Sequence, residues 1–501
     1  MDEQRVQAYL SLIQELLECP SGEEPQILSQ SLELLDGGFV QVCELVAAQL
    51  QEAGQENNAR FLRNVAQQLG AYLAQQGTGG NQQEVLVQFW LQLLQAEMQG
   101  GTAAVHQVMR QNVGLIVPNL GDTIAQFLQG LLAQNPDQAE GVAGLVEDTC
   151  ISIQQFPYGR YAEALEIAIC GYRVVLELRA DNPQKRAQTL TNLGVARRNQ
   201  AKMGINPAVN VEGAIIAYNE AAGILQELGL DKDLSDTLNN LGLARSTQAG
   251  MGINPAANLE SAITACNEAA GISRRLGLDK DLSDTLNNLG IAHKIQAEMG
   301  INPAANLESA IAAHDEAAGI LRGLGLDKDL SDILTGLGNT HSIQAKMGIN
   351  PTANLESAIA AYNEAAGIRR RLGLDKDLSS TLTGLGNARS SQAEMGINPA
   401  ANLEAAIAAC NEAAGIMRRL GLEKDLSGTL TNLGNARRSQ AEMGINPAAN
   451  LEAAIAAYDE AAEIRQRLEL EKDLPRTLTN LGNARLTQAK MGINPAANLD
   501  S

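Results

Sequence analysis

The sequence predicts an all-α protein in which repeated helix–turn–helix pairs stack into an α-solenoid, preceded by an α-helical N-terminal domain. Three observations support this. A 48-residue unit recurs, with "MGINPAANLE" beginning at Met251 and again at Met299, and periods of about 20–50 residues are typical of solenoids. Apolar residues within the unit are spaced by three or four, as on one face of a helix. Aromatic residues are only 3% of the chain, whereas one large globular core normally contains more.

Charge divides the chain into two segments. Of the net charge of −21, residues 1–150 carry −14, from 18 acidic residues and four arginines without any lysine. The other 351 residues carry −7, from 40 acidic and 33 basic residues. This difference predicts an acidic, Gln-rich helical domain over 1–149 and a solenoid over 150–501. The solenoid would contain a divergent first repeat (150–202), six full units (203–490) and an incomplete last unit (491–501).

The N-terminal domain is predicted from amphipathic segments. Residues 4–28 indicate two helices separated by a Pro/Gly break, and residues 34–54, 57–76 and 84–99 indicate further helices. Gly77–Gln83 is predicted to be a linker or long turn.

The repeat is represented by the unit that begins at Asp377. Its first helix is predicted over 378–395, and Gly396 and Pro399 are expected to end it. Asn402 is predicted to be the N-cap of the second helix, over 403–420. Neither helix can bury its apolar stripe alone, so the pairs are expected to stack.

A glycine follows leucine at the centre of every first helix. Glycine inside a helix costs about 1 kcal/mol relative to alanine, so its recurrence predicts that a neighbouring helix passes too close for a side chain. These Leu-Gly glycines are Gly194, Gly242, Gly290, Gly338, Gly386, Gly434 and Gly482.

The unit resembles a tetratricopeptide repeat (TPR). Leu433–Gly434 matches the family's first helix, and Ala214, Ile215, Tyr218 and Ala221 match the Ala-Ile-x-x-Tyr-x-x-Ala signature of its second helix. The resemblance implies a right-handed α-solenoid that binds proteins. Two features depart from the family: the unit is longer than the usual repeat of about 34 residues, and arginine or histidine replaces the aromatic residue after Leu-Gly. The replacements are Arg245, His293, His341 and Arg389.

The N-terminal segment has a resemblance of its own. "QAYLSLIQELLECPSGEEPQIL", "LLDGGF" and "FLRNVAQQL" are similar to the N-terminal region of bacterial, cyanobacterial-type TPR proteins, which often carry a C-terminal CHAT domain with a caspase-like peptidase fold. This resemblance implies an alternative function, the regulatory or sensor arm of a CHAT peptidase system whose catalytic domain is absent from this chain.

No catalytic, cofactor or metal site is predicted, and the chain is expected not to be an enzyme. The caspase-like catalytic histidine is followed by glycine, and none of His106, His293, His314 and His341 is. No phosphate-binding loop, HExxH or paired-cysteine motif occurs. Cys266 and Cys410 occupy a position that holds tyrosine or histidine in other repeats and are predicted to be core residues. None of the six cysteines is in CxxC spacing, and a reducing, cytoplasmic location is expected.

Protein or peptide partners are expected, rather than nucleic acid or membranes. An acidic chain repels phosphate, and no apolar stretch approaches 18 residues. In TPR proteins the first helix lines the concave groove, so variable polar positions of that helix are the candidate peptide-binding residues. Asparagine there can donate to and accept from a peptide backbone, and aspartates would suit basic residues of a partner. The alternative interpretation is a generic solvated helix face. The candidates are Asn192, Asn240, Asn288, Asn339, Asn387, Asn432, Asn435, Asn480, Asn483, Asp236, Asp284 and Asp332.

The position after the Leu-Gly glycine changes in order along the chain. It is apolar in the earlier repeats, at Val195, Leu243 and Ile291, and asparagine from Asn339 onwards. This drift predicts a groove that holds a segment with one apolar end and one polar end.

The last unit stops after "GINPAANLDS", which leaves the helix at about 473–490 without its second helix. Truncation ahead of further repeats or an effector domain is the favoured interpretation. Cover by another molecule, including self-association through this uncapped end, is the alternative.

Overall fold

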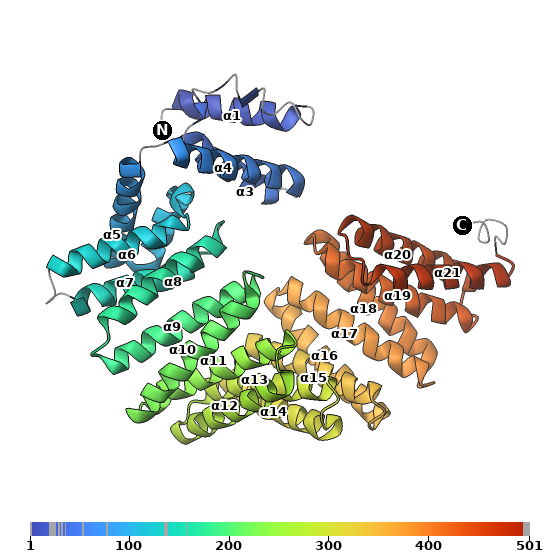
Figure 1. The fold of residues 1–501 in the computed structure, drawn as a ribbon. Helices are drawn as coiled ribbons and strands as arrows, with labels where there is room; N and C mark the ends of the chain where they lie inside the picture. Colours follow the sequence, from blue (N-terminus) through green and yellow to red (C-terminus); the bar gives the residue numbers. More distant parts are fainter. Residues whose placement is uncertain are drawn as a thin grey trace. The chain divides into compact units, whose positions relative to one another are not determined.

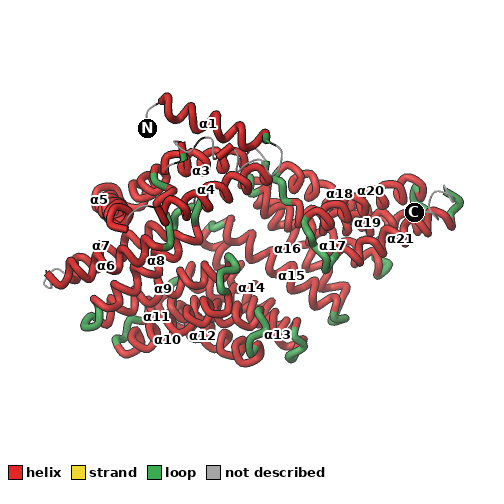
Figure 2. Tube along the Cα trace, turned by 45° about the horizontal axis from the view of Figure 1, so that its top comes forward, coloured by secondary structure: helices red, strands yellow, loops and turns green. Residues whose placement is uncertain are grey.

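The computed structural model describes residues 3–19, 27–28, 31, 34–35, 37–52, 55–76, 79–134, 139–157 and 159–493. All regular elements in these ranges are helices, and no strand occurs in them (Figure 2). The chain forms two compact units, Met1–Gly252 and Ile253–Ser501. Because this division lies inside the predicted solenoid, the domain boundary near residue 150 stays a prediction.

The first unit begins with an N-terminal group of helices and continues into helical repeats (Figure 1). Its elements are α1 (Glu3–Glu18), α3 (Gly37–Glu52), α4 (Glu56–Gln76), α5 (Gly79–Gln111), η2 (Val113–Leu115), α6 (Asn119–Gln134), α7 (Ala139–Gln154), α8 (Tyr161–Leu178), α9 (Pro183–Lys202), α10 (Pro207–Glu227) and α11 (Asp231–Gly250). Helices α1, α3 and α4 share a core that includes Tyr9, Phe39 and Leu62. From α7 to α11 each helix packs against the next in chain order.

The linker prediction over Gly77–Gln83 is wrong where the structure describes it. Helix α5 begins at Gly79, because the glutamines that follow are good helix formers. Residues 77 and 78 lie outside the described ranges.

The second unit consists of stacked helix pairs. It contains α12 (Pro255–Leu276), α13 (Asp279–Glu298), α14 (Pro303–Leu324), α15 (Asp327–Lys346), α16 (Pro351–Leu372), α17 (Asp375–Glu394), α18 (Pro399–Arg419), α19 (Glu423–Glu442), α20 (Pro447–Arg467) and α21 (Leu474–Lys490). The odd-numbered helices are the first helices of repeats and the even-numbered ones are the second helices. Each first helix between α13 and α19 packs against the second helices before and after it. The predicted α-solenoid of helix–turn–helix repeats is confirmed. None of the described helices is long and apolar enough to span a membrane.

The turn between the two helices of a repeat differs from the prediction. Gly396 (φ 77°) and Asn398 (φ 39°) both adopt left-handed backbone conformations, and Pro399 is then the first residue of α18, a position that suits its fixed φ. The N-cap prediction for Asn402 is therefore wrong, because the second helix begins at Pro399. Asn402 lies inside the helix, and its Nδ2 donates to the carbonyl of Ile397 at 2.7 Å.

Five of the seven Leu-Gly glycines, Gly194, Gly290, Gly338, Gly386 and Gly434, lie beside one side chain of the second helix in the same repeat. We call these side chains the wedge residues: Tyr218, His314, Tyr362, Cys410 and Tyr458. A Cβ atom on Gly434 would lie 2.6 Å from Cε1 of Tyr458, and one on Gly386 would lie 2.6 Å from Sγ of Cys410. The predicted steric need for glycine is confirmed at these five positions, and the obstacle is a side chain of the paired helix, whereas no described atom lies within 4 Å of a Cβ on Gly482.

Candidate functional site

The candidate asparagines of the second unit lie on the first helices and reach the surface to different extents. Asn339 and Asn483 are exposed. The other members are half-buried: Asn288, Asn387, Asn432, Asn435 and Asn480. The wedge residue of each repeat decides how its asparagine is used.

Three of these asparagines form internal hydrogen bonds. The hydroxyl of Tyr458 donates to Oδ1 of Asn435 at 2.7 Å, and Nδ2 of Asn480 donates to the same oxygen at 3.2 Å. The hydroxyl of Tyr362 likewise donates to Oδ1 of Asn339 at 2.7 Å. The acceptor oxygens of Asn339 and Asn435 therefore hold a tyrosine in place, which is a structural role that the sequence analysis missed.

Asn387 and Asn432 occupy the same two repeat positions as Asn435 and Asn480 but are not bonded. The wedge residue of this repeat is Cys410, which has no hydroxyl group to donate to Asn387. Neither amide side chain has a hydrogen bond within the described part of the chain. Helices α17 and α19 thus present two neighbouring amides whose donors and acceptors are available to a ligand.

The first unit uses its two asparagines internally. Nδ2 of Asn192 donates to Oε1 of Glu147 at 3.1 Å, and the buried Glu147 also forms an ion pair with the buried Arg179. Nδ2 of Asn240 donates to the carbonyl of Asp236 in its own helix at 3.0 Å.

Two of the candidate aspartates already pair with bases of the chain. Asp284 forms an ion pair with Lys280 at 2.6 Å, one turn earlier in α13. Asp332 forms one with the buried Arg369 of α16 at 2.5 Å. A basic ligand would therefore compete with an internal partner at both positions.

The arginines and histidines that replace the family's aromatic residue have a defined role. Nδ1 of His341 lies 2.7 Å from Oδ1 of Asn354, and Nη1 of Arg389 donates to Oδ1 of Asn402 at 2.8 Å. Each of these contacts joins the first helix to an asparagine of the second helix, and Nδ2 of that asparagine also donates to a backbone carbonyl of the turn. The sequence analysis missed this contact, although the recurrence of both residues 13 positions apart in successive units could have indicated it.

Chemistry at the cysteines and histidines is limited by burial. Cys266 and Cys410 are buried, and burial raises the pKa of each thiol to about 12. Both are therefore protonated at neutral pH, and the predicted core role is confirmed. His106 uses Nε2 to contact the carbonyl of Ser152 at 2.8 Å. In the part of the chain that the structure describes, no group of three or more His, Cys, Asp or Glu side chains is arranged to hold a metal ion.

Comparisons with known proteins give fold-level similarities. No family model matches the chain, and no curated protein matches it. Among solved structures, a signal-transduction ATPase with a tetratricopeptide repeat sensor from Pyrococcus horikoshii is 14% identical, with a TM-score of 0.41 and coverage of 97% of this chain and 72% of that one. Aspartyl phosphate phosphatase F from Bacillus subtilis is 13% identical, with a TM-score of 0.42 and coverage of 86% and 94%.

A third similar structure is a monomeric mutant of IFIT1 solved with Gppp-AAAA. It is 11% identical, with a TM-score of 0.29 and coverage of 92% of this chain and 100% of that one. These likenesses concern helical repeats, and none assigns an activity or a partner to this chain.

Proposed function

We propose that the chain is a non-enzymatic TPR-type scaffold that binds an extended protein or peptide segment on the exposed face of its first helices. The observation that carries this proposal is the pair Asn387 and Asn432, whose side chains have no hydrogen bond to any described residue although their equivalents Asn435 and Asn480 are joined. A surface amide offers two donors and one acceptor, so two neighbouring amides can bond the backbone of a ligand whatever its sequence.

The apolar part of the ligand would be held nearer the start of the second unit. Ile291 of α13 is half-buried and occupies the repeat position that Asn387 has in α17. Partial burial leaves apolar surface for a ligand side chain, and covering it stabilises a complex by about 25 cal/mol per Å². The proposed ligand therefore has an apolar residue towards α13 and polar backbone contacts at α17 and α19.

The test is selection from a displayed random peptide library on the immobilised full chain. In Asn387→Ala/Asn432→Ala, loss of two hydrogen bonds should weaken the selected peptide about tenfold. The matched control is Asn363→Ala/Asn411→Ala, at exposed positions of second helices, which should leave binding unchanged. Cys410→Tyr is an independent variant that should also weaken peptide binding. Its new hydroxyl would donate to Oδ1 of Asn387, as Tyr458 does to Asn435, while Asn387 itself is kept. Equal weakening in the control, or no selected peptide at all, would refute the proposal.

Partner class and location complete the proposal. The net charge of −21 disfavours nucleic acid, and binding of a single-stranded RNA probe at low salt would contradict this. None of the six cysteines, all of which lie in the described ranges, forms a disulfide, which suits a reducing cytoplasm. The alternative function, a regulatory arm of a CHAT system, rests on the N-terminal resemblance alone, and no contact among the described residues favours it.

A further inference from the structure

Helix α9 of the first unit contains a buried arginine that pairs with no carboxylate in the described part of the chain. Arg198 is 9% exposed, and its Nε and Nη1 atoms have no hydrogen-bond partner among the described residues. Removing a charge from water is costly unless a counter-ion and hydrogen bonds compensate it. The guanidinium of Arg198 therefore indicates a place for an anion.

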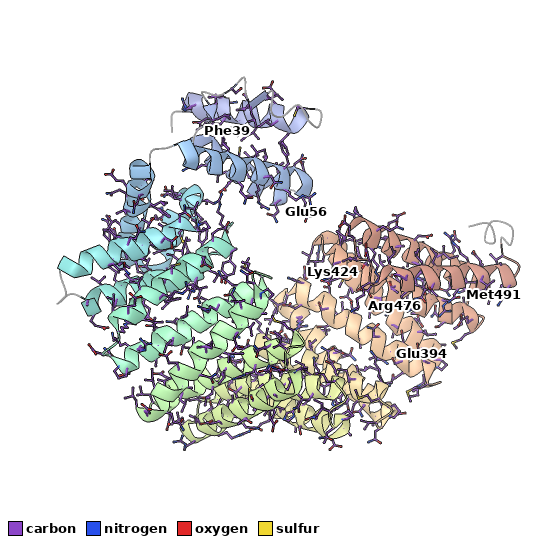
Figure 3. All side chains as sticks on the ribbon, in the orientation of Figure 1. Phe39, Glu56, Glu394, Lys424, Arg476 and Met491 are labelled. Carbon is purple, nitrogen blue, oxygen red and sulfur yellow. The ribbon has the colours of Figure 1, made fainter. Side chains whose placement is uncertain are left out.

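The equivalent arginine of α19 shows how the protein compensates this charge elsewhere. Arg438 forms an ion pair with Glu442, four residues later, at 3.3 Å. Lys202 replaces that glutamate in α9. The position is also glutamate in α13 and α17, and Glu394 lies exposed at the end of α17 (Figure 3). Helix α9 thus has two cations, one turn apart, where α19 has a cation and an anion.

The second cation of α9 is accessible from solvent. The side chain of Lys202 is exposed, and residues four apart on a helix lie on the same face. Partial burial of the ammonium group, together with the charge of Arg198, lowers the pKa of Lys202. The two side chains are therefore close enough to repel each other, and an anion bound by both would relieve this repulsion.

A third donor comes from Tyr218 of α10. Its ring lies against α9 one turn before Arg198, because a Cβ atom on Gly194 would lie 2.5 Å from Cε1 of the ring. The hydroxyl is buried without a hydrogen-bond partner among the described residues, since Val195 occupies the position of the asparagine that accepts from two other wedge tyrosines. Burial raises the pKa of Tyr218 to about 12, and the charge of Arg198 opposes this shift. The hydroxyl is therefore protonated at neutral pH and can donate.

We propose that Arg198, Lys202 and Tyr218 bind a phosphomonoester group or free phosphate. Such a group has a charge of about −1.5 to −2 at neutral pH and three acceptor oxygens, which match two cations and three donor side chains. A carboxylate has one charge and two oxygens, and the phosphodiester of a nucleic acid has one charge, so both match this site less well. The inference does not depend on the function proposed above, because α9 and α10 belong to the first unit whereas Asn387 and Asn432 belong to the second.

The test is isothermal titration calorimetry of the full chain with inorganic phosphate, at neutral pH and constant ionic strength. Saturable binding of one phosphate per chain is expected. Arg198→Met should weaken binding about tenfold or more and Tyr218→Phe about fivefold, as expected for a charged and a neutral hydrogen bond. Lys202→Glu should abolish binding, because the new carboxylate would pair with Arg198.

The matched control is Lys346→Glu. It changes the net charge equally at the same repeat position of α15, where Ser342 replaces the arginine, and it should bind phosphate like the unmodified chain. Urea unfolding gives a second readout. Phosphate should raise the urea midpoint of the unmodified chain but not that of Lys202→Glu, which should be at least as stable without phosphate.

The outcomes separate the possible anions. No phosphate binding, or binding that survives Lys202→Glu, overturns the proposal. Acetate that binds as tightly as phosphate overturns it in favour of a carboxylate. A capped Gly-phosphoserine-Gly peptide that displaces phosphate assigns the site to phosphorylated protein segments, whereas a peptide that fails to displace it assigns the site to free phosphate.

Discussion

His314 occupies the wedge position at which other repeats carry tyrosine or cysteine. Its side chain is 1% exposed, and neither ring nitrogen has a hydrogen-bond partner among the described residues. The ring lies against Gly290 of α13 and Gly336 of α15. Burial, together with the nearby charges of Lys294 of α13 and His341 of α15, lowers the pKa of His314 to about 4. The folded protein therefore holds this imidazole neutral.

This burial predicts a loss of stability in mild acid. In the unfolded chain His314 takes up a proton near pH 6.5, but in the folded chain it does so only near pH 4. The free energy of unfolding should therefore fall as the pH falls from about 6.5 to about 4, by on the order of 3 kcal/mol, and His314 should contribute no further loss below that range. His314→Tyr and His314→Cys should both flatten the dependence of the urea midpoint on pH. Identical pH profiles for all three proteins would contradict the assignment.

The hydroxyl groups of two wedge tyrosines should differ in their contribution to stability. The hydroxyl of Tyr458 donates to Asn435, whereas that of the buried Tyr218 has no partner among the described residues. Tyr458→Phe should lower the free energy of unfolding by about 1 kcal/mol. Tyr218→Phe should leave it unchanged or raise it, because a buried unbonded hydroxyl is removed. Urea unfolding of the two variants measures the difference, and equal losses would show that the Asn435 bond is not decisive.

At the scale of elements, the sequence predicted the helices and the reason for the glycines, but not the contacts between turns and helices. The apolar residues spaced by three or four from Leu378 onwards, and the turn residues Gly396 and Pro399, were sufficient to predict the two helices of the repeat. Both patterns depend only on residues that are close in the sequence. The N-cap prediction at Asn402 failed because the helix already begins at Pro399, after Asn398 in a left-handed conformation. Asparagine tolerates this conformation, but its presence in a sequence does not predict it. The use of Asn435 by Tyr458 depends on the packing of two helices, which spacing alone does not specify.

Helices α19 and α20 lack an ion pair that α15 and α16 have. The buried Arg369 bonds Asp332 at 2.5 Å. The buried Arg465 has the same repeat position, and its Nε donates to Ser427 at 3.3 Å, but residue 428 is glycine. Burial lowers the pKa of Arg465, and the nearby Asp473 opposes this shift. No atom lies within 4 Å of a Cβ on Gly428 among the described residues, so a side chain fits there.

Gly428→Asp should therefore stabilise the second unit. The matched control is Gly428→Asn, which has the same shape and a similar helix propensity without the charge. The aspartate variant should be more stable than the asparagine variant by about 1 kcal/mol in urea unfolding. This advantage should vanish when Arg465→Met is added, since methionine occupies that position at Met417 of the preceding repeat. An advantage that persists without Arg465 would exclude the ion pair as its cause.

At the scale of the whole molecule, the second unit is joined along its length by one recurring ion pair. An arginine near the end of α12, α14, α16 and α18 bonds a glutamate of the next second helix, at 2.7–2.9 Å. The pairs are Arg274–Glu316, Arg322–Glu364, Arg370–Glu412 and Arg418–Glu460. Each arginine is about half exposed, so a single pair contributes little. In a solenoid, however, the free energy of unfolding is the sum of the stabilities of the single repeats and of the interfaces between neighbouring repeats. Here the same ion pair contributes at successive interfaces.

Removing all four glutamates should weaken the coupling between repeats in a salt-dependent way. With glutamine at Glu316, Glu364, Glu412 and Glu460, the urea transition should broaden, and the free energy of unfolding should fall by about 1–2 kcal/mol at low salt. In about 1 M salt, where the Debye length is about 3 Å, most of this difference should disappear. The control places glutamine at the exposed Glu308, Glu356, Glu404 and Glu452, which changes the net charge equally without breaking these pairs. The urea transition of this control should stay sharp. Equal broadening in both variants would mean that net charge, rather than pairing between neighbouring repeats, sets the cooperativity of the array.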